Sequence, residues 1–228
     1  MKNATRMFAS TFGAIMALAG IEHGIGEILQ GNIATSGIMI LSWPESEFFR
    51  SLGGEPAMTV IPNLLITGIL AVSISLALLL WSVWFVHREY GGWVVILLSC
   101  AMLLVGGGIF PPILAILIGV VALRIDSPLT WWRTHLSQAI RRSLAGLWPW
   151  SFAACILAWI SMLPGVPLIG YFFGVDNAWV ILVILLCALG TLFLTGFTGF
   201  AYDSQRQAGT RPYSPDTENL SSFLGSIL

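Results

Sequence analysis

The sequence predicts an all-α, polytopic helical membrane protein with about six transmembrane segments. Its 228 residues are 57% hydrophobic and only 9% charged, and the mean hydropathy is +0.87. A soluble globular domain carries roughly 25% charged residues, so a water-soluble fold is not expected. The apolar residues also form long uninterrupted runs, and Lys and Arg gather between alternate runs. Both patterns are typical of helices that cross a bilayer.

Six stretches have the length and composition of membrane-spanning helices. About 20 apolar residues cross the ~30 Å hydrocarbon layer, because a helix rises ~1.5 Å per residue. The predicted spans are residues 7–29, 61–86, 93–108, 111–125, 147–163 and 178–201.

The third and fourth spans come from one apolar run, residues 90–123, which is too long for a single crossing. Gly106-Gly107-Gly108 and Pro111-Pro112 stand in its middle, and both residue types break helices. Each half would be only ~22–24 Å long. We favour two thin crossings, and a re-entrant hairpin that enters and leaves on one side is the alternative.

The distribution of positive charge predicts the orientation. With six spans, nearly all Lys and Arg residues fall on one side: Lys2, Arg6, Arg88, Arg124, Arg133, Arg141, Arg142, Arg206 and Arg211. Of the 10 Lys and Arg residues, only Arg50 falls on the other side. Cytoplasmic loops carry an excess of positive charge, so we expect both termini in the cytoplasm and the protein in the plasma (inner) membrane.

The N-terminus has a second interpretation. Lys2 and Arg6, an apolar stretch and then Ala17-Leu18-Ala19 resemble a cleavable signal peptide. The apolar character continues to Leu29, beyond the cleavage site, which favours an uncleaved first span.

Outside the spans, the sequence predicts three segments. Residues 31–56 form an outer loop, residues 127–148 an amphipathic helix at the cytoplasmic interface, and residues 203–228 a polar cytoplasmic tail, mostly disordered, that follows the bundle of residues 1–202. Apolar residues of segment 127–148 recur at three- and four-residue steps after Ser127-Pro128, a helix start. We expect Arg133, Arg141 and Arg142 of this helix to contact anionic lipid headgroups; an ordinary charged loop is the alternative.

One polar cluster lies inside the first span. Glu22, His23 and Glu27 are ionisable residues in an otherwise apolar helix, where each charge at the bilayer centre costs ~2.5–3.5 kcal/mol. His23 and Glu27 are four residues apart and share a helix face, so the Glu27 carboxylate can hydrogen-bond the imidazole. Asn63, at the outer end of the second span, lies at matching depth. We predict that these four residues bind a proton, a cation or a substrate, and interfacial polarity without a site is the alternative.

Small residues follow one side of the same span. Gly13, Ala17, Gly20 and Gly24 repeat at three or four residues, which permits close helix packing. Gly196 and Gly199 in the last span are expected to receive a similar contact.

Three classes of function fit this pattern. A small ion- or solute-handling transporter that uses the polar cluster is the leading one, because the chain combines polar groups at membrane depth with a broken helix. A non-catalytic scaffold or complex subunit and a membrane-embedded enzyme for a lipid or isoprenoid substrate are the alternatives. The net charge of −1 gives no case for nucleic-acid binding. No motif identifies a cofactor or a metal, and a homo-oligomer or a membrane partner stays open.

Overall fold

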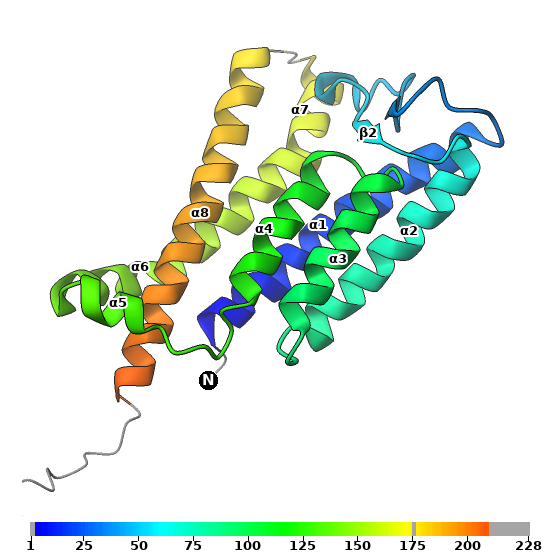
Figure 1. Ribbon diagram of the computed structural model, residues 1–228. Helices are drawn as coiled ribbons and strands as arrows, with labels where there is room; N and C mark the ends of the chain where they lie inside the picture. Colours follow the sequence, from blue (N-terminus) through cyan, green and yellow to red (C-terminus); the bar gives the residue numbers. More distant parts are fainter. Residues whose placement is uncertain (1–2, 175–176, 210–228) are drawn as a thin grey trace, which may run out of the picture.

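The computed structural model describes residues 3–174 and 177–209 (Figure 1). Within these ranges the chain is all-helical apart from one small hairpin of two strands, which confirms the predicted all-α class. Four helices are long and apolar enough to span a membrane: Ala4–Gln30, Leu64–Phe85, Gln138–Phe173 and Ala178–Gln207. The other two predicted spans are shorter apolar helices, Gly91–Leu104 and Phe110–Ala122.

The helix that carries the polar cluster, α1 (Ala4–Gln30), packs against α2, α4 and α8. Its apolar side chains Phe12 and Met16 are fully buried in a core shared with neighbouring helices. Asn3 caps its start by accepting a hydrogen bond from the backbone N–H of Arg6 at 3.2 Å. The helix ends at Gly31, which has a positive φ of 89°.

Small residues hold α1 close to α2 (Leu64–Leu80), which continues into a π-helical turn, η2 (Trp81–Phe85). The backbones meet where Gly24 faces Gly68, and a Cβ on Gly24 would lie 2.8 Å from the Gly68 carbonyl oxygen. Gly13 likewise faces Ser82. The predicted small-residue packing is therefore confirmed, and its partner is α2.

The contact expected at Gly196 and Gly199 differs from the close backbone contact between α1 and α2. Both lie on α8 (Ala178–Gly209), where a Cβ on Gly196 would meet only Phe8, at 3.8 Å, among the described residues. A Cβ on Gly199 would meet the Trp148 ring at 3.1 Å. Since the glycines of α1 turn toward α2, α8 packs on bulkier side chains.

The broken apolar run forms two antiparallel helices, α3 (Gly91–Leu104) and α4 (Phe110–Ala122), as predicted from the glycines and prolines between them. Their 14 and 13 residues correspond to about 21 and 20 Å. The turn at residues 105–109 is fixed by its backbone: the N–H of Gly106 donates to the Met58 carbonyl at 2.8 Å, and the N–H of Val60 donates to the Leu104 carbonyl at 3.0 Å.

The segment between α1 and α2 contains β1 (Met39–Leu41), a single 3-10 turn η1 (Arg50–Leu52) and β2 (Pro56–Met58). The strands are antiparallel, with Ile40 opposite Ala57. We call the end of the bundle that carries these strands and the turn at residues 105–109 the hairpin end. The opposite end, which carries Asn3 and residues 203–209, is the terminal end (Figure 1).

The continuous amphipathic helix expected over residues 127–148 is wrong. The chain forms a short helix α5 (Thr130–His135), becomes extended at Leu136 and Ser137, and starts α6 (Gln138–Ile160). The Ser137 hydroxyl accepts from the N–H of Ile140 at 3.4 Å, so a new helix cap interrupts the pattern. Residues 138–148 are therefore the first turns of a long apolar helix.

The last two spans are longer than predicted. α6 continues through a π-helical turn η3 (Ser161–Gly165) into α7 (Val166–Phe173), and α8 runs to Gly209. Residues 203–209 of the expected polar tail are therefore helical, and residues 210–228, which make up most of that tail, lie outside the described part. The Asp203 carboxylate explains the extension, because it accepts from the N–H groups of Ala4 at 2.8 Å and Thr5 at 2.9 Å.

Candidate functional site

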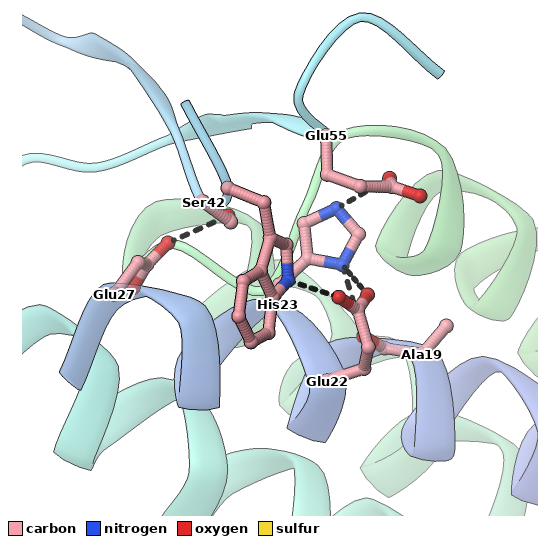
Figure 2. A network of polar contacts seen from close by, with 7 residues as sticks. Ala19, Glu22, His23, Glu27, Ser42 and Glu55 are labelled. Carbon is pink, nitrogen blue, oxygen red and sulfur yellow. Dashed lines mark hydrogen bonds and ion pairs between the residues drawn. The ribbon is translucent and has the colours of Figure 1, made fainter. Parts of the chain in front are cut away.

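The polar residues of α1 lie at the hairpin end, beneath the β1–β2 segment (Figure 2). His23 and Glu27 are buried, with 3% and 0% of their surfaces exposed, and Glu22 is partly exposed. The cluster is therefore covered by other parts of the chain.

His23 lies between two carboxylates. Its Nδ1 is 2.9 Å from the Ala19 carbonyl oxygen and 3.1 Å from Glu22 Oε2, and its Nε2 is 3.2 Å from Glu55 Oε2. Figure 2 shows the imidazole with one carboxylate at each nitrogen. The side chain of Glu22 is 31% exposed and that of Glu55 15%. We call Glu22, His23 and Glu55 the relay triad.

Glu55 reaches His23 because the loop before β2 reverses sharply. Gly53, Gly54 and Glu55 all have positive φ, of 69°, 76° and 56°. The carbonyl of Glu55 accepts from the N–H of Ser42 at 3.0 Å, which places the residue across from β1. Sequence reasoning missed Glu55, because nothing local separates it from the other glutamates of the outer loop. The Gly-Gly pair before it was the available signal, since such pairs mark turns.

A second set of contacts joins α1 to the same loop. The Trp43 indole N–H donates to Glu22 Oε1, and its ring stacks on Phe49 with centroids 5.0 Å apart. The Gln30 amide donates to the carbonyls of Leu41 at 3.0 Å and Ser42 at 2.9 Å. These bonds hold the loop against the last turns of α1 and orient Glu22.

Glu27 pairs with the loop and not with His23. Its Oε1 accepts from the Ser42 hydroxyl at 3.3 Å, and its Oε2 has no hydrogen-bond partner among the described residues. The His23–Glu27 hydrogen bond that the spacing permits is not formed, because the His23 nitrogens face Glu22 and Glu55 instead. The two residues share a buried face, as their spacing predicts.

The turn between α3 and α4 closes the site from the other side. Gly106 has φ +92° and its backbone lies against the Glu27 carboxylate, where a Cβ would overlap both oxygens. Gly108 has φ +85°, and a Cβ there would lie 2.8 Å from His23 Nε2. Only glycine satisfies both the positive φ and the close approach.

Asn63 is not part of this cluster. Its side-chain oxygen accepts from the N–H of Ile66 at 3.0 Å, and its amide donates to Asn32 Oδ1 at 2.7 Å. It is the N-cap of α2. The similar depth in the two helices suggested a contact, but the capping role turns the side chain along its own helix.

Two cavities adjoin the relay triad. The larger, of about 380 Å³, is lined by Glu22 and Glu55 together with apolar residues of α1, the outer loop and the α6–η3 region. The second, of about 260 Å³, is lined by His23 and Glu55 and by residues of α4, α6, η3 and α8. Glu55, Trp159 and Leu163 border both cavities.

One donor atom from each residue of the triad lies within 4.8 Å of the others, which invites comparison with a metal site. Three nitrogen and oxygen ligands would suit a zinc ion with an open position. However, Glu22 lies at Nδ1, which also faces the Ala19 carbonyl, whereas Glu55 lies at Nε2. The shortest carboxylate contact of each nitrogen is thus made by a different glutamate, so the ring can share protons on both sides, while one donor atom of each residue also lies close enough to hold a metal ion.

No protein-family model, curated protein or solved structure matches this chain. Its function therefore has to be inferred from the geometry of the relay triad and its cavities.

Proposed function

We propose that this chain is a small ion- or solute-handling membrane transporter in which the relay triad binds and releases a proton. The observation that supports the proposal is the pairing of both His23 nitrogens with acceptors. Nδ1 faces a carbonyl and a carboxylate, so it carries a hydrogen. Nε2 faces the Glu55 carboxylate at 3.2 Å, and two acceptors at that distance need a proton between them.

The triad lies between the two cavities. Glu22 borders the larger cavity only, His23 the smaller cavity only, and Glu55 borders both. A proton held between His23 and Glu55 is therefore adjacent to both spaces. Ionisable residues buried at membrane depth typically mark proton or ion pathways.

We further propose that the chain crosses the plasma (inner) membrane six times, with the hairpin end outside and both termini in the cytoplasm. The bias of Lys and Arg toward the terminal end supports this orientation. The short helices α3 and α4 would then be thin crossings. On the cytoplasmic side, Arg133, Arg141 and Arg142 would meet anionic headgroups, with Arg133 also donating to Gln207 Oε1 at 2.9 Å.

Proton flux into proteoliposomes tests the proposal. A pH-sensitive dye inside the vesicles reports proton entry driven by a potassium diffusion potential. We expect flux with the native protein and a loss of roughly tenfold or more with His23→Gln, because an amide has no titratable proton. His135→Gln, at an exposed histidine of α5, is the matched control and is expected to behave like the native protein. Flux that is absent from the native protein, or equal in His23→Gln, would contradict the proposal and favour a scaffold.

A second candidate is a membrane enzyme that acts on a lipid or isoprenoid substrate. The observation that favours it is the position of an imidazole and two carboxylates beside largely apolar cavities. Incubation of the native protein with membrane lipids would then yield a product that His23→Gln does not form. Mass spectrometry of the extracted lipids distinguishes this outcome from transport.

A further inference from the structure

We propose that the larger cavity binds a lipophilic organic cation: an ammonium head at Glu22 and Glu55 with an apolar body along the cavity wall. The inference rests on the proposed transport function, because it names the substrate class that would exchange with the proton of the triad.

The charge of the lining selects the head of the ligand. Glu22 and Glu55 are the charged side chains among the described residues that line this cavity, and no Lys or Arg joins them. His23 offers at most one positive charge against these two carboxylates. A phosphate or carboxylate head would meet uncompensated negative charge in an apolar setting, which is strongly unfavourable. An ammonium group complements the site.

The wall of the cavity selects the body of the ligand. Phe48, Phe49 and Trp159 supply aromatic rings, and Ile15 and Leu163 supply aliphatic surface. Aromatic faces attract cations and apolar groups alike. The volume of about 380 Å³ falls in the range of small-molecule sites.

The position of the cavity gives a route of entry from the bilayer. Leu18 and Ile160 line it, and these residues are 54% and 53% exposed on the outside of the helices. Amphiphilic molecules partition into membranes, so a site that opens at the flank is accessible to them.

Proton and cation would compete for one carboxylate. Glu55 Oε2 is 3.2 Å from His23 Nε2 and also borders the cavity, so an ammonium ion that pairs with Glu55 takes the place of the shared proton. Acidification is therefore expected to weaken cation binding.

Binding of radiolabelled decyltrimethylammonium to the full chain in nanodiscs tests the inference. We expect unlabelled decylammonium to displace the probe, and decanol and decyl phosphate to require concentrations higher by roughly tenfold or more. Glu55→Gln should weaken binding by roughly tenfold, whereas Glu45→Gln, an exposed carboxylate of the same loop, should leave it unchanged. Glu22→Gln serves as a second variant in case Glu55→Gln does not fold.

The outcomes separate this inference from the proposed function. Displacement by decanol as effective as by decylammonium, or unchanged binding in both glutamine variants, would overturn the cation site while His23-dependent proton flux could persist. Cation binding that depends on Glu55 without any proton flux would instead overturn transport and keep the site.

Discussion

At the residue scale, the site depends on positions without side chains as much as on its charged groups. Gly106 and Gly108 let the turn between α3 and α4 lie directly on Glu27 and His23. Both adopt a positive φ, a conformation that costs other residues ~1–2 kcal/mol. The turn thus excludes water from the buried carboxyl and imidazole, and its sequence is dictated by backbone geometry.

Gly108→Ala tests this role. We expect it to lower stability by about 2 kcal/mol or more, because the strained φ adds to an overlap with the His23 ring. Gly37→Ala is the matched control, since a Cβ there meets no atom of the described residues within 4 Å. Thermal unfolding in detergent measures both variants. Equal melting temperatures for the two variants would contradict the close packing of the turn against His23.

His87, in the turn between η2 and α3, gives a pH prediction outside the spans. Burial, with Arg6 and Arg88 nearby, lowers the pKa of His87 below its ordinary value of 6.5. The unfolded chain therefore binds more protons just below pH 6.5, so this residue's contribution to stability is complete above 6.5 and is lost as the pH falls.

We expect the melting temperature of the native protein to fall more between pH 7.5 and 5.5 than that of His87→Gln. His135→Gln, at an exposed histidine, should keep the native pH dependence. A His87→Gln profile that overlays the native one would contradict the prediction.

Sequence reasoning found Glu22, His23 and Glu27 because ionisable residues stand out in an apolar helix. It could not find Glu55 or Ser42, whose contacts with α1 depend on the path of a loop more than ten residues long. The sequence pattern sets the face of a helix, but the left-handed backbone before β2 decides which glutamate meets the imidazole.

At the scale of elements, side-chain hydrogen bonds connect the last described helix, α8, to the start of the first helix, α1. The Asp203 carboxylate of α8 accepts from Ala4 N, Thr5 N and, at 2.6 Å, the Thr5 hydroxyl. A negative charge at a helix start stabilises free N–H groups. The polar composition after residue 202 suggested a tail, whereas this long-range cap extends α8. The break at Ser137 is a similar case. The side-chain cap at Ser137 starts a new helix there, although the apolar repeat alone predicts one continuous helix.

Asp203→Ala tests this connection. We expect a loss of about 2–3 kcal/mol, because buried N–H groups lose their acceptors. Asp203→Asn keeps one acceptor oxygen and should lose less. Glu89→Ala, at an exposed acidic residue of a turn, should change stability by no more than ~0.5 kcal/mol. Chemical denaturation in mixed micelles measures the free energy of unfolding of the three variants. An Asp203→Ala variant as stable as the native protein would contradict the proposed cap of α1 by Asp203.

At the scale of the whole molecule, the number of crossings decides how the site relates to the two aqueous phases. Under the proposed topology the hairpin end lies on one side of the bilayer, and the pair α3–α4 returns to its starting side whether it crosses the membrane twice or forms a re-entrant hairpin. Composition predicted the four long apolar helices and the two shorter ones, because hydropathy acts along whole segments. The depth of α3 and α4 was not predictable, since it depends on packing against α1 and α2.

Cysteine labelling tests the proposed orientation. Single cysteines at Glu47 and Asn177 of the hairpin end should react with a membrane-impermeant maleimide on intact spheroplasts, because the positive charge keeps the other end inside. Cysteines at Glu89 and Thr134 should react only after permeabilisation. The background protein carries Ala at Cys100, Cys155 and Cys187.

External labelling at Thr134 with protection at Glu89 would mean that residues 91–122 cross the membrane once. Labelling of both from outside would reverse the orientation, and the relay triad would then face the cytoplasm.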